Sequence, residues 1–586
     1  MAGIKTKYKI IGLASLAVIG GLTIPKLMSY IPKPASVTAR VPEAVHIARM
    51  HINQGDPGDY QLTANPGDSG GCVKLLTLPW QAGGSLNYAN GGARTKPGSL
   101  VAKYAGGCVS IEREDSYDTM KQKMVAFANG DTQNGAPFVM IMGDGLPYFA
   151  YGLNGMMPGR FKAIGALGFS NGEDGCFLPP EAKRDPQKAR GMTVAASKLD
   201  GDWNICVKWA SDNGVPINSN TKEFHRDALN FIDTGSFIEA DERFVSNAPE
   251  DRIEVNHGLA TGKTVQVRPD GVTTWTPGDD YIVHKRGGVV KVASTRDYES
   301  QMPALIIGDS QWMAAHKQFV VGLLKAADRG ANAIRTDDEA FHAMTLAHAE
   351  IFGINGKGQP QERTPEYWAK YFPGFTETDN AGNQVLLGGS EVINLREQAT
   401  FFGLTPGSLN IFKGVYTTFG GYGHTFYPTD FPNVLPYDEV MDLSYLKEAL
   451  SGVTLTAQTN TKFAEAAPIT EAISKTGFHV EFDSGKATIK PESFEMLNDI
   501  ANRAGMTNLR IRIVGFTDNA GSDTVNVPLS RARAQAVADF LNRLAPSTFP
   551  KGRMQVSGMG SATPIADNAT DTGRRQNRRV EITLGN

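Results

Sequence analysis

The chain has 586 residues and a formal net charge of −3, with 41% hydrophobic residues, 64 glycines and 32 prolines. This length allows three or four domains of ordinary size, and the hydrophobic content is ample for their cores. The near-neutral charge balance argues against nucleic-acid binding as a property of the whole protein.

The first residues carry the pattern of a membrane anchor. Three lysines in residues 1–9 precede an uncharged run over 10–25, and apolar residues around Lys26 extend that run to residue 31. A lysine in this position can reach the bilayer surface while its stem stays in the lipid. We therefore expect an uncleaved transmembrane signal anchor at 10–31, with a basic cytoplasmic tip at 1–9 and exported chain beyond it. Cleavage of this segment is the alternative.

Residues 32–71 are rich in Pro, Gly, Asp and Asn and are expected to form a spacer. Within them, residues 67–71 spell GDSGG, the nucleophile motif of chymotrypsin-like proteases. Those proteases place His and Asp upstream of the motif. Too little chain precedes residue 67 to hold that β-barrel, so we interpret the stretch as a linker.

Residues 72–455 form the largest expected unit, in which apolar runs alternate with helical patterns. Strands are predicted at 73–78, 109–113, 138–142 and 164–167, with helices from Ser99, over 116–128 and from Pro147. This βαβα order is typical of a parallel, doubly wound sheet. A second α/β set follows, with a strand at 192–196 and a helix near 203–209. The chain then returns through a strand at 303–307, and helices are predicted at 310–327, 337–351 and 391–402.

A chain that leaves one lobe, builds a second and returns has the layout of a type II periplasmic solute-binding protein. Two stretches resemble that group: PFVMIMGDGLPYFAYGLN at 137–154 and QMPALIIGDSQWMAAHKQFVVGLLKAADRG at 301–330. The region looks most like the phosphate-transporter-type binding domains. The resemblance implies a two-lobed α/β fold with a small-molecule ligand in the cleft.

Loops at the carboxyl ends of strands supply the candidate cleft residues. These are Gly84, Ser85, Asp144, Glu173, Asp174, Asp202, Trp203, Trp275 and Asp279. An oxyanion site favours Ser, Thr, backbone N–H groups and Arg, whereas carboxylates beside indoles suit an amine, a cationic peptide or a sugar. Phosphate is still a candidate ligand. The alternative interpretation is that Asp and Gly are ordinary turn residues in these loops.

No catalytic, metal or cofactor site is predicted. Ser310 in a Gly-Asp-Ser sequence fits a helix N-cap, and His342 and His348 lack the i,i+4 spacing of a helical metal motif. We therefore expect a protein that is not an enzyme.

Residues 456–476 are small and polar and are expected to link this unit to a last domain at 477–586. In that domain Ile511 and Ile513 alternate with arginines as in a strand, and a polar loop follows. Ser530 is a suitable N-cap for the next helix. Arg533 lies on the apolar stripe of that helix, so it needs a partner, and Asp518 is the candidate.

This domain resembles the OmpA-like peptidoglycan-binding domain. The motifs are Gly515-Phe516-Thr517-Asp518-Asn519, the run from Asn526 to Val537, Pro564-Ile565-Ala566-Asp567-Asn568, and Asn577-Arg578-Arg579-Val580-Glu581-Ile582. The resemblance implies binding of the diaminopimelate of the stem peptide. It assigns the ammonium to Asp518 and the carboxylate to Arg533, with Asn526 and Thr517 shaping the loop. Phe516 stands where the family often has His, and the basic run RRQNRRV is expected to begin a strand. A purely structural Asp518–Arg533 ion pair is the alternative.

The four cysteines are Cys72, Cys108, Cys176 and Cys206. None has the C-x-x-C spacing of a zinc site, and an even number in a chain that recognises cell wall suggests disulfides. Of the three connectivities, proximity favours Cys72–Cys108 with Cys176–Cys206. Four free buried thiols are the alternative.

The expected function is that of a non-catalytic, inner-membrane-anchored envelope protein with most of its chain in the periplasm. It is expected to hold peptidoglycan through the C-terminal domain and to carry a solute-binding-like sensor or scaffold. Membrane proteins are possible partners, and no nucleic-acid partner is expected. A stator-like or other envelope-complex subunit is a second candidate, but ion-driven stators need a carboxylate in the span, and residues 10–25 have none. An importer component for phosphate or another solute, and a wall-modifying enzyme, are also open.

Overall fold

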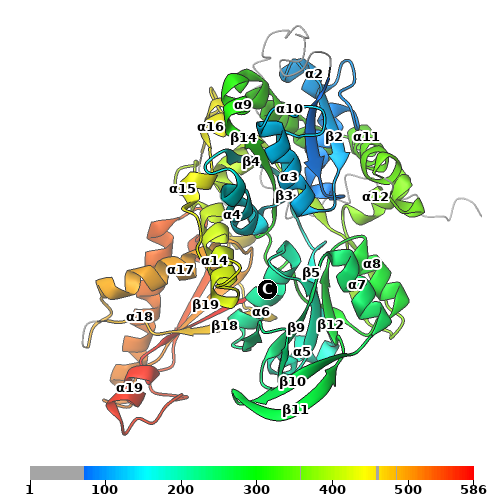
Figure 1. The fold of residues 1–586 in the computed structure, drawn as a ribbon. Coiled ribbons are helices and arrows are strands. Elements are labelled where there is room, and N and C mark those ends of the chain that lie inside the picture. The colour runs from blue at the N-terminus through cyan, green and yellow to red at the C-terminus, as the bar shows by residue number, and fades with distance from the viewer. Residues whose placement is uncertain (1–70, 357, 457–460, 483–484) are drawn as a thin grey trace, which may run out of the picture.

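The computed structural model describes residues 71–586 except 357, 457–460 and 483–484 (Figure 1). The basic tip at 1–9, the expected anchor at 10–31 and most of the spacer lie outside these residues. Within the described part of the chain, no helix combines the length and apolar character needed to cross a membrane.

The first lobe, at the top of Figure 1, is built on a sheet with strand order β17-β4-β14-β3-β1-β2. Its strands are β1 (Val73–Thr77), β2 (Val109–Arg113), β3 (Phe138–Met142), β4 (Phe161–Ser170), β14 (Pro303–Asp309) and β17 (Ser390–Val392). Every residue of β3 and β14 is buried, as expected for central strands with helices on both faces.

Helices surround this sheet. They are α1 (Gly84–Asn90), α2 (Leu100–Tyr104), α3 (Tyr117–Ala128), α4 (Leu146–Met156), α9 (Ser310–Ala315), α10 (Lys317–Thr336), α11 (Asp338–His348), α12 (Pro365–Tyr371), α13 (Leu395–Phe401), α14 (Ile411–Phe426), α15 (Tyr437–Val440) and α16 (Ser444–Ala449). A hairpin of β15 (Phe375–Thr378) and β16 (Gln384–Leu387) extends from α12 toward the second lobe.

The second lobe has a sheet of order β13-β5-β12-β6-β9-β7. Its strands are β5 (Gly175–Leu178), β6 (Thr193–Ser197), β7 (Ile217–Asn218), β9 (Leu229–Thr234), β12 (Gly271–Thr274) and β13 (Val290–Ser294). Its helices are α5 (Pro180–Arg184), α6 (Gly201–Asp212), α7 (Phe237–Ser246) and α8 (Gly278–Lys285). A small separate sheet joins β8 (Glu223–His225), β10 (Glu250–Asn256) and β11 (Leu259–Val267).

The two-lobed α/β layout agrees with the expectation from the sequence, but neither sheet is purely parallel. β14 runs antiparallel to β3 and β4, and β5 runs antiparallel to β12 and β13. Both strands adjoin the segments that cross between the lobes, at 171–174 and 295–302. Neighbouring strands become parallel when a helix connects the end of one to the start of the next. β14 and β5 are each entered from the other lobe instead, so they can run in the opposite direction.

The disulfides follow the pairing that the sequence favours. Cys72 bonds to Cys108 with a Cα–Cα distance of 4.6 Å, and Cys176 bonds to Cys206 with a Cα–Cα distance of 5.0 Å. The first disulfide joins the starts of β1 and β2, and the second holds α6 against β5. Each lobe therefore has one covalent crosslink.

The C-terminal domain has a sheet of order β18-β21-β19-β20, with α18 packed against β19 and β20, and α17 next to α18 and to α14 of the first lobe. Its elements are β18 (Ala472–Phe478), α17 (Phe494–Gly505), β19 (Arg510–Gly515), α18 (Asp523–Leu544), β20 (Met554–Gly558), α19 (Asp571–Asn577) and β21 (Val580–Gly585). β18 begins inside the segment 456–476, so the linker is shorter than the sequence suggested.

Helix α18 also begins earlier than expected. It starts at Asp523, contains Pro528, and includes Ser530, which the sequence suggested as the N-cap. The Ser530 hydroxyl instead accepts from the Gly560 N–H at 3.0 Å. A Cβ on Gly515 would lie 2.0 Å from the Ser530 carbonyl oxygen, so this glycine lets the helix approach the sheet closely.

The C-terminal domain is packed on both lobes rather than suspended from them (Figure 1). The Thr548 hydroxyl accepts from the Leu409 N–H of the first lobe at 3.2 Å. The Asn213 side chain of the second lobe donates to the Ile473 carbonyl at 3.1 Å. The Ser300 N–H, in a crossing segment, donates to the Met506 carbonyl at 3.0 Å. The segment that joins the last domain to the rest of the chain is thus supplemented by direct contacts with both lobes.

Candidate functional site

The structure places Asp518 and Arg533 near each other but does not pair them. Asp518 follows β19 and its carboxylate binds Arg578 at 2.6 Å, while Arg533 projects from α18 and donates to the Lys486 carbonyl at 3.1 Å. Among the described residues, no ion pair within 4.0 Å joins Asp518 to Arg533. The partner that the sequence suggested for Arg533 is thus taken by another guanidinium.

A recess of about 260 Å³ opens beside these residues. Its walls include Arg533, Arg578, Arg575 and Lys490, with Glu481 as a carboxylate of the opposite sign. Arg533 is only 6% exposed and lies over the Phe482 ring at 5.0 Å. Burial, followed by the neighbouring Arg578 charge, lowers the pKa of Arg533. An anion that enters the recess would relieve this repulsion. Asp518 does not line the recess, but it binds Arg578, which does.

The loop that carries Asp518 is held by the residues that the family resemblance singles out. The Asn526 amide donates to the Ala520 carbonyl at 3.1 Å and to the Gly521 carbonyl at 3.3 Å. Thr517 is buried, and its N–H donates to the Gly560 carbonyl at 2.8 Å. Phe516 lies beneath the Arg579 guanidinium at 3.8 Å, so the aromatic ring at this position has a packing role.

Arg578 is the residue that sequence reasoning missed. The run around it was expected only to begin a strand, yet Arg578 reaches back across the domain to Asp518. Its neighbour Asn577 orders the adjoining loop, because its side-chain oxygen accepts from the N–H groups of Ile565 and Ala566 at 2.8 and 3.0 Å. The motif Asn-Arg-Arg was visible in the sequence, but the sequence cannot tell which arginine faces which residue.

The cleft candidates of the two-lobed domain divide into two groups. Asp144, Glu173, Asp174, Asp202 and Asp279 lie at the junction of the lobes, each at most 2% exposed. Gly84 and Ser85 instead pack within the first lobe: the Ser85 hydroxyl donates to the Leu167 carbonyl at 3.3 Å, and a Cβ on Gly84 would meet Met344 at 2.5 Å.

Trp203 and Trp275 are buried on the second-lobe side of the junction. Trp203 contacts Tyr427 with ring centroids 5.5 Å apart, and Trp275 contacts Phe237 at 3.7 Å. Neither indole N–H has a hydrogen-bond partner among the described residues. Both rings therefore keep a donor that a further group can use.

Burial raises the pKa of the junction carboxyl groups. It raises the pKa of Asp144 to about 8 and that of Asp174 to about 7, while Asp202 and Glu173 lie well above their ordinary values. Asp174 also adds repulsion to Asp144, Asp202 and Glu173. Near neutral pH these groups compete for protons rather than all carrying charge.

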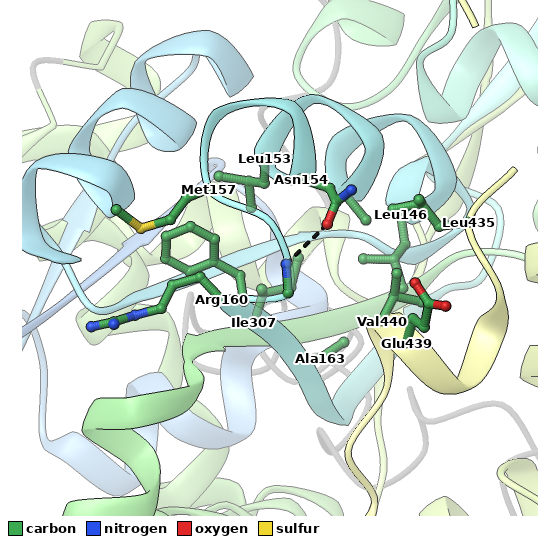
Figure 2. Close-up of a pocket in the computed structure, with 13 residues that line it drawn as sticks. Leu146, Leu153, Asn154, Met157, Arg160, Ala163, Ile307, Leu435, Glu439 and Val440 are labelled. Carbon is green, nitrogen blue, oxygen red and sulfur yellow. Dashed lines mark hydrogen bonds between the residues drawn. The ribbon is translucent and has the colours of Figure 1, made fainter. Parts of the chain in front are cut away.

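A separate recess on the first lobe does not suit a solute. It lies between α4, β4, β14 and the segment around Val440, and Leu146, Leu153 and Ile307 make its wall apolar (Figure 2). The Asn154 side-chain oxygen accepts a hydrogen bond from the Gly159 N–H at 3.0 Å. Its free volume of about 20 Å³ is close to that of one water.

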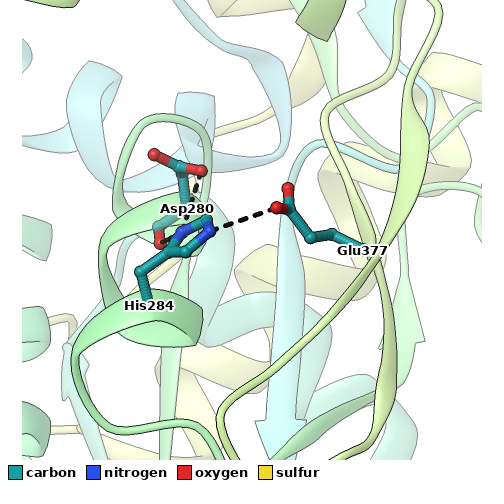
Figure 3. Close-up of side chains that lie close together, drawn as sticks. All are labelled: Asp280, His284 and Glu377. Carbon is teal, nitrogen blue, oxygen red and sulfur yellow. Dashed lines mark hydrogen bonds and ion pairs between the residues drawn. The ribbon is translucent and has the colours of Figure 1, made fainter. Parts of the chain in front are cut away.

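A second cluster that the sequence did not predict lies on the outer surface. His284 and Asp280, one turn apart on α8, meet Glu377 of the β15–β16 hairpin (Figure 3). Their ligand atoms lie within 4.8 Å of one another, a spacing compatible with a metal ion. The imidazole is already engaged at both nitrogens, by the Asp280 carbonyl at 2.8 Å and by Glu377 at 3.2 Å. Two acceptors favour the imidazolium, so we interpret the cluster as an ionic contact between α8 and the hairpin.

The pKa of His284 should therefore lie above its ordinary value of 6.5, chiefly because its ring donates to the Asp280 carbonyl. The contact is present below the unfolded pKa and is lost as the pH rises through the folded one. An NMR titration of the ring should show the raised pKa, and Glu377→Gln should lower it. A wild-type ring that titrates at or below 6.5 would contradict this interpretation.

Comparisons with known proteins concern mainly the C-terminal domain. Residues 481–578 match the OmpA family. "Peptidoglycan-binding protein ArfA" of Mycobacterium tuberculosis is 40% identical over 110 residues, which are 19% of this chain and 33% of that protein. "Probable lipoprotein YiaD" of Escherichia coli is 38% identical over 107 residues, 18% of this chain and 48% of that protein. The chain thus spans between a third and a half of the length of these relatives.

Two solved structures are similar to different parts of the chain. The cell wall anchor of the T6SS from Pseudomonas aeruginosa has 31% identity and a TM-score of 0.18, and the match covers 20% of this chain and 86% of that one. The periplasmic nitrate-binding protein NrtA from Synechocystis has 12% identity and a TM-score of 0.43, and the match covers 65% of this chain and 89% of that one.

Proposed function

We propose that this chain is a non-catalytic envelope protein that holds peptidoglycan through its C-terminal domain and presents the two-lobed domain as a receptor or scaffold. The observation that carries the proposal is the recess beside Asp518 and Arg533, where the two side chains are not paired with each other. The OmpA family match over 481–578 and the peptidoglycan-binding relatives support it.

The ligand proposed for the recess is the diaminopimelate of the stem peptide. Its side chain carries an ammonium and a carboxylate. Arg533, in the wall of the recess, would take the carboxylate, and Asp518, which lies next to the wall residue Arg578, would take the ammonium. Binding would exchange the Asp518–Arg578 contact for a ligand contact and leave Arg578 free to face the carboxylate. Charge-assisted hydrogen bonds of this kind are about twice as strong as neutral ones.

Anchoring in the inner membrane through residues 10–31 belongs to the same proposal. It rests on the lysines in 1–9 and the uncharged run that follows. A membrane anchor at the N-terminus and a peptidoglycan-binding domain at the C-terminus would keep the two-lobed domain at a fixed place in the periplasm. That arrangement suits local sensing or recruitment of a partner better than shuttling a solute.

Co-sedimentation of the full chain with diaminopimelate-containing sacculi tests wall binding. Asp518→Ala and Arg533→Ala should each lower the affinity at least about tenfold, because each removes one charged contact worth more than about 1.4 kcal/mol. Free diaminopimelate should compete with the sacculi for the wild-type chain.

Matched controls come from the exposed face of the same helix. Asp539→Ala and Arg531→Ala remove the same side chains at exposed positions, and they should leave binding unchanged. Circular dichroism checks that every variant is folded. Full binding by both Asp518→Ala and Arg533→Ala would contradict the proposed role of the recess.

A further inference from the structure

Acidic side chains from three parts of the fold meet where the two lobes face each other. Asp144 follows β3 of the first lobe, Glu173 and Asp174 lie in the first crossing segment, and Asp202 and Asp279 begin helices of the second lobe. Strand ends of both lobes and a crossing segment thus contribute to one place. Each of these carboxyl groups is 0–2% exposed.

The carboxyl groups act on one another in the order Asp279, Glu173, Asp174, Asp202 and Asp144, which we call the row, and one cation lies at its Asp279 end. Lys291 reaches Asp279 at 3.3 Å and donates to the Gly172 and Glu173 carbonyls at 2.5 and 3.1 Å. Among the described residues, no ion pair within 4.0 Å neutralises Asp144, Glu173, Asp174 or Asp202. The carboxyl groups without a cationic partner therefore lie at the Asp144–Asp202 end of the row.

Unpartnered polar atoms at this end give a second, independent observation. Both carboxylate oxygens of Asp174 and of Asp202, and one oxygen of Asp144, accept no hydrogen bond of normal geometry among the described residues. Asp174 and Asp202 interact with each other, and in the described part of the chain neither forms an ion pair with a cation. Gln301 donates to the other Asp144 oxygen at 2.9 Å, yet its own carbonyl oxygen is unpartnered. Buried polar groups are rarely left in this condition without a role. A donor-rich ligand would satisfy them.

The chemistry of the row selects the kind of ligand. A cluster of carboxylates repels phosphate, nitrate and other anions. A metal ion needs oxygens that converge on one point, and among the described residues the convergent group is the outer Asp280–His284–Glu377 cluster, not these acids. Ammonium groups spaced along a flexible chain can meet acids in a row, and the buried indoles of Trp203 and Trp275 suit the methylenes and the cationic groups.

We propose that the lobe junction binds a linear organic polyamine, with one ammonium held by Asp144, Asp174 and Asp202. This deepens the receptor role proposed above for the two-lobed domain and rests on it. A second ammonium lies further along the row, where Glu173 keeps an unpartnered oxygen. The ligand enters when the lobes separate at the crossing segments 171–174 and 295–302, and it is enclosed when they close.

Calorimetric titration of the full chain with spermidine tests the proposal, with inorganic phosphate, glucose and CaCl₂ as separate titrants. Spermidine should bind, and Asp202→Asn and Asp174→Asn should each weaken it at least about tenfold, since each loses a buried charged contact. Asp251→Asn, at an exposed position in the same lobe, should bind as the wild type does. The two junction variants are nearly isosteric with the native residues and remove repulsion, so the fold should be retained.

The outcomes separate this proposal from the one on which it rests. If phosphate, glucose or Ca²⁺ binds and spermidine does not, the polyamine site is overturned, but the proposed receptor role of the two-lobed domain is retained. No binding of any titrant would overturn the polyamine site and favour a scaffold. Spermidine affinity unchanged in Asp202→Asn would overturn the placement at the lobe junction. Sacculus binding by Asp202→Asn should stay intact in every case, because Asp202 lies outside the wall-binding recess.

Discussion

Raising the pH from about 5 to about 8 is expected to lower the free energy of unfolding of the two-lobed domain by several kcal/mol. Burial raises the pKa of Asp144 to about 8, that of Asp174 to about 7 and that of Asp200 to about 6, from an ordinary value of 3.8. Between the unfolded and folded pKa values the folded chain holds more protons than the unfolded one. Stability therefore falls as the pH rises, by about 1.4 kcal/mol per pH unit for each such group.

Tryptophan fluorescence during urea unfolding measures this effect in the two-lobed domain. All six tryptophans lie between residues 80 and 368, so the signal does not come from the C-terminal domain. Asp174→Asn and Asp202→Asn should flatten the dependence on pH, whereas Asp251→Asn should not change it. The His284 contact also makes the protein less stable as the pH rises, because the pKa of this histidine is raised in the folded state. The variant His284→Gln measures how much of the pH dependence comes from this contact.

A stability that rises with pH over this range would contradict the buried, unneutralised state of the junction acids. Spermidine should reverse the trend if it binds at the junction, because a bound cation stabilises the ionised carboxylates. The dependence on pH without ligand thus follows from the fold alone, and its reversal depends on the proposed ligand.

Replacing Arg553 by methionine is expected to destabilise the C-terminal domain by about 3–5 kcal/mol. The guanidinium is 2% exposed and donates to four backbone carbonyls. These are the carbonyls of Leu509 at 2.9 Å, Thr548 at 2.8 Å, Ala504 at 2.8 Å and Thr507 at 2.5 Å. Methionine fills part of the volume but leaves these buried acceptors without donors.

Calorimetry is the suitable measurement, because the C-terminal domain contains no tryptophan. The transition of this domain should move to lower temperature in Arg553→Met and stay in place in Lys551→Met, an exposed neighbour. Phe463 lies 5.1 Å from the Arg553 guanidinium, so the variant should also loosen the segment that joins the domains. An unchanged transition would mean that the carbonyls find other donors.

The sequence by itself determined the elements that depend on local pattern. The alternation of apolar and polar residues at 109–113 predicted the edge strand β2, and the continuous apolar run at 138–142 predicted the central strand β3, both with their observed bounds. The separated motifs of the C-terminal domain identified its family and pointed to Asp518, Arg533, Asn526 and Thr517. Proximity in the chain favoured the disulfide pairing that the structure has.

Only the tertiary structure decided which distant side chains meet. Asp518 and Arg578 are 60 residues apart, and Glu173 contacts Ser390 across 217 residues. The direction of β14 and β5, the row of carboxyl groups at the lobe junction and the packing of the C-terminal domain on both lobes all depend on where crossing segments return. Sequence periodicity records which face of an element is buried, but not which other element covers it, because that choice is made by long-range packing.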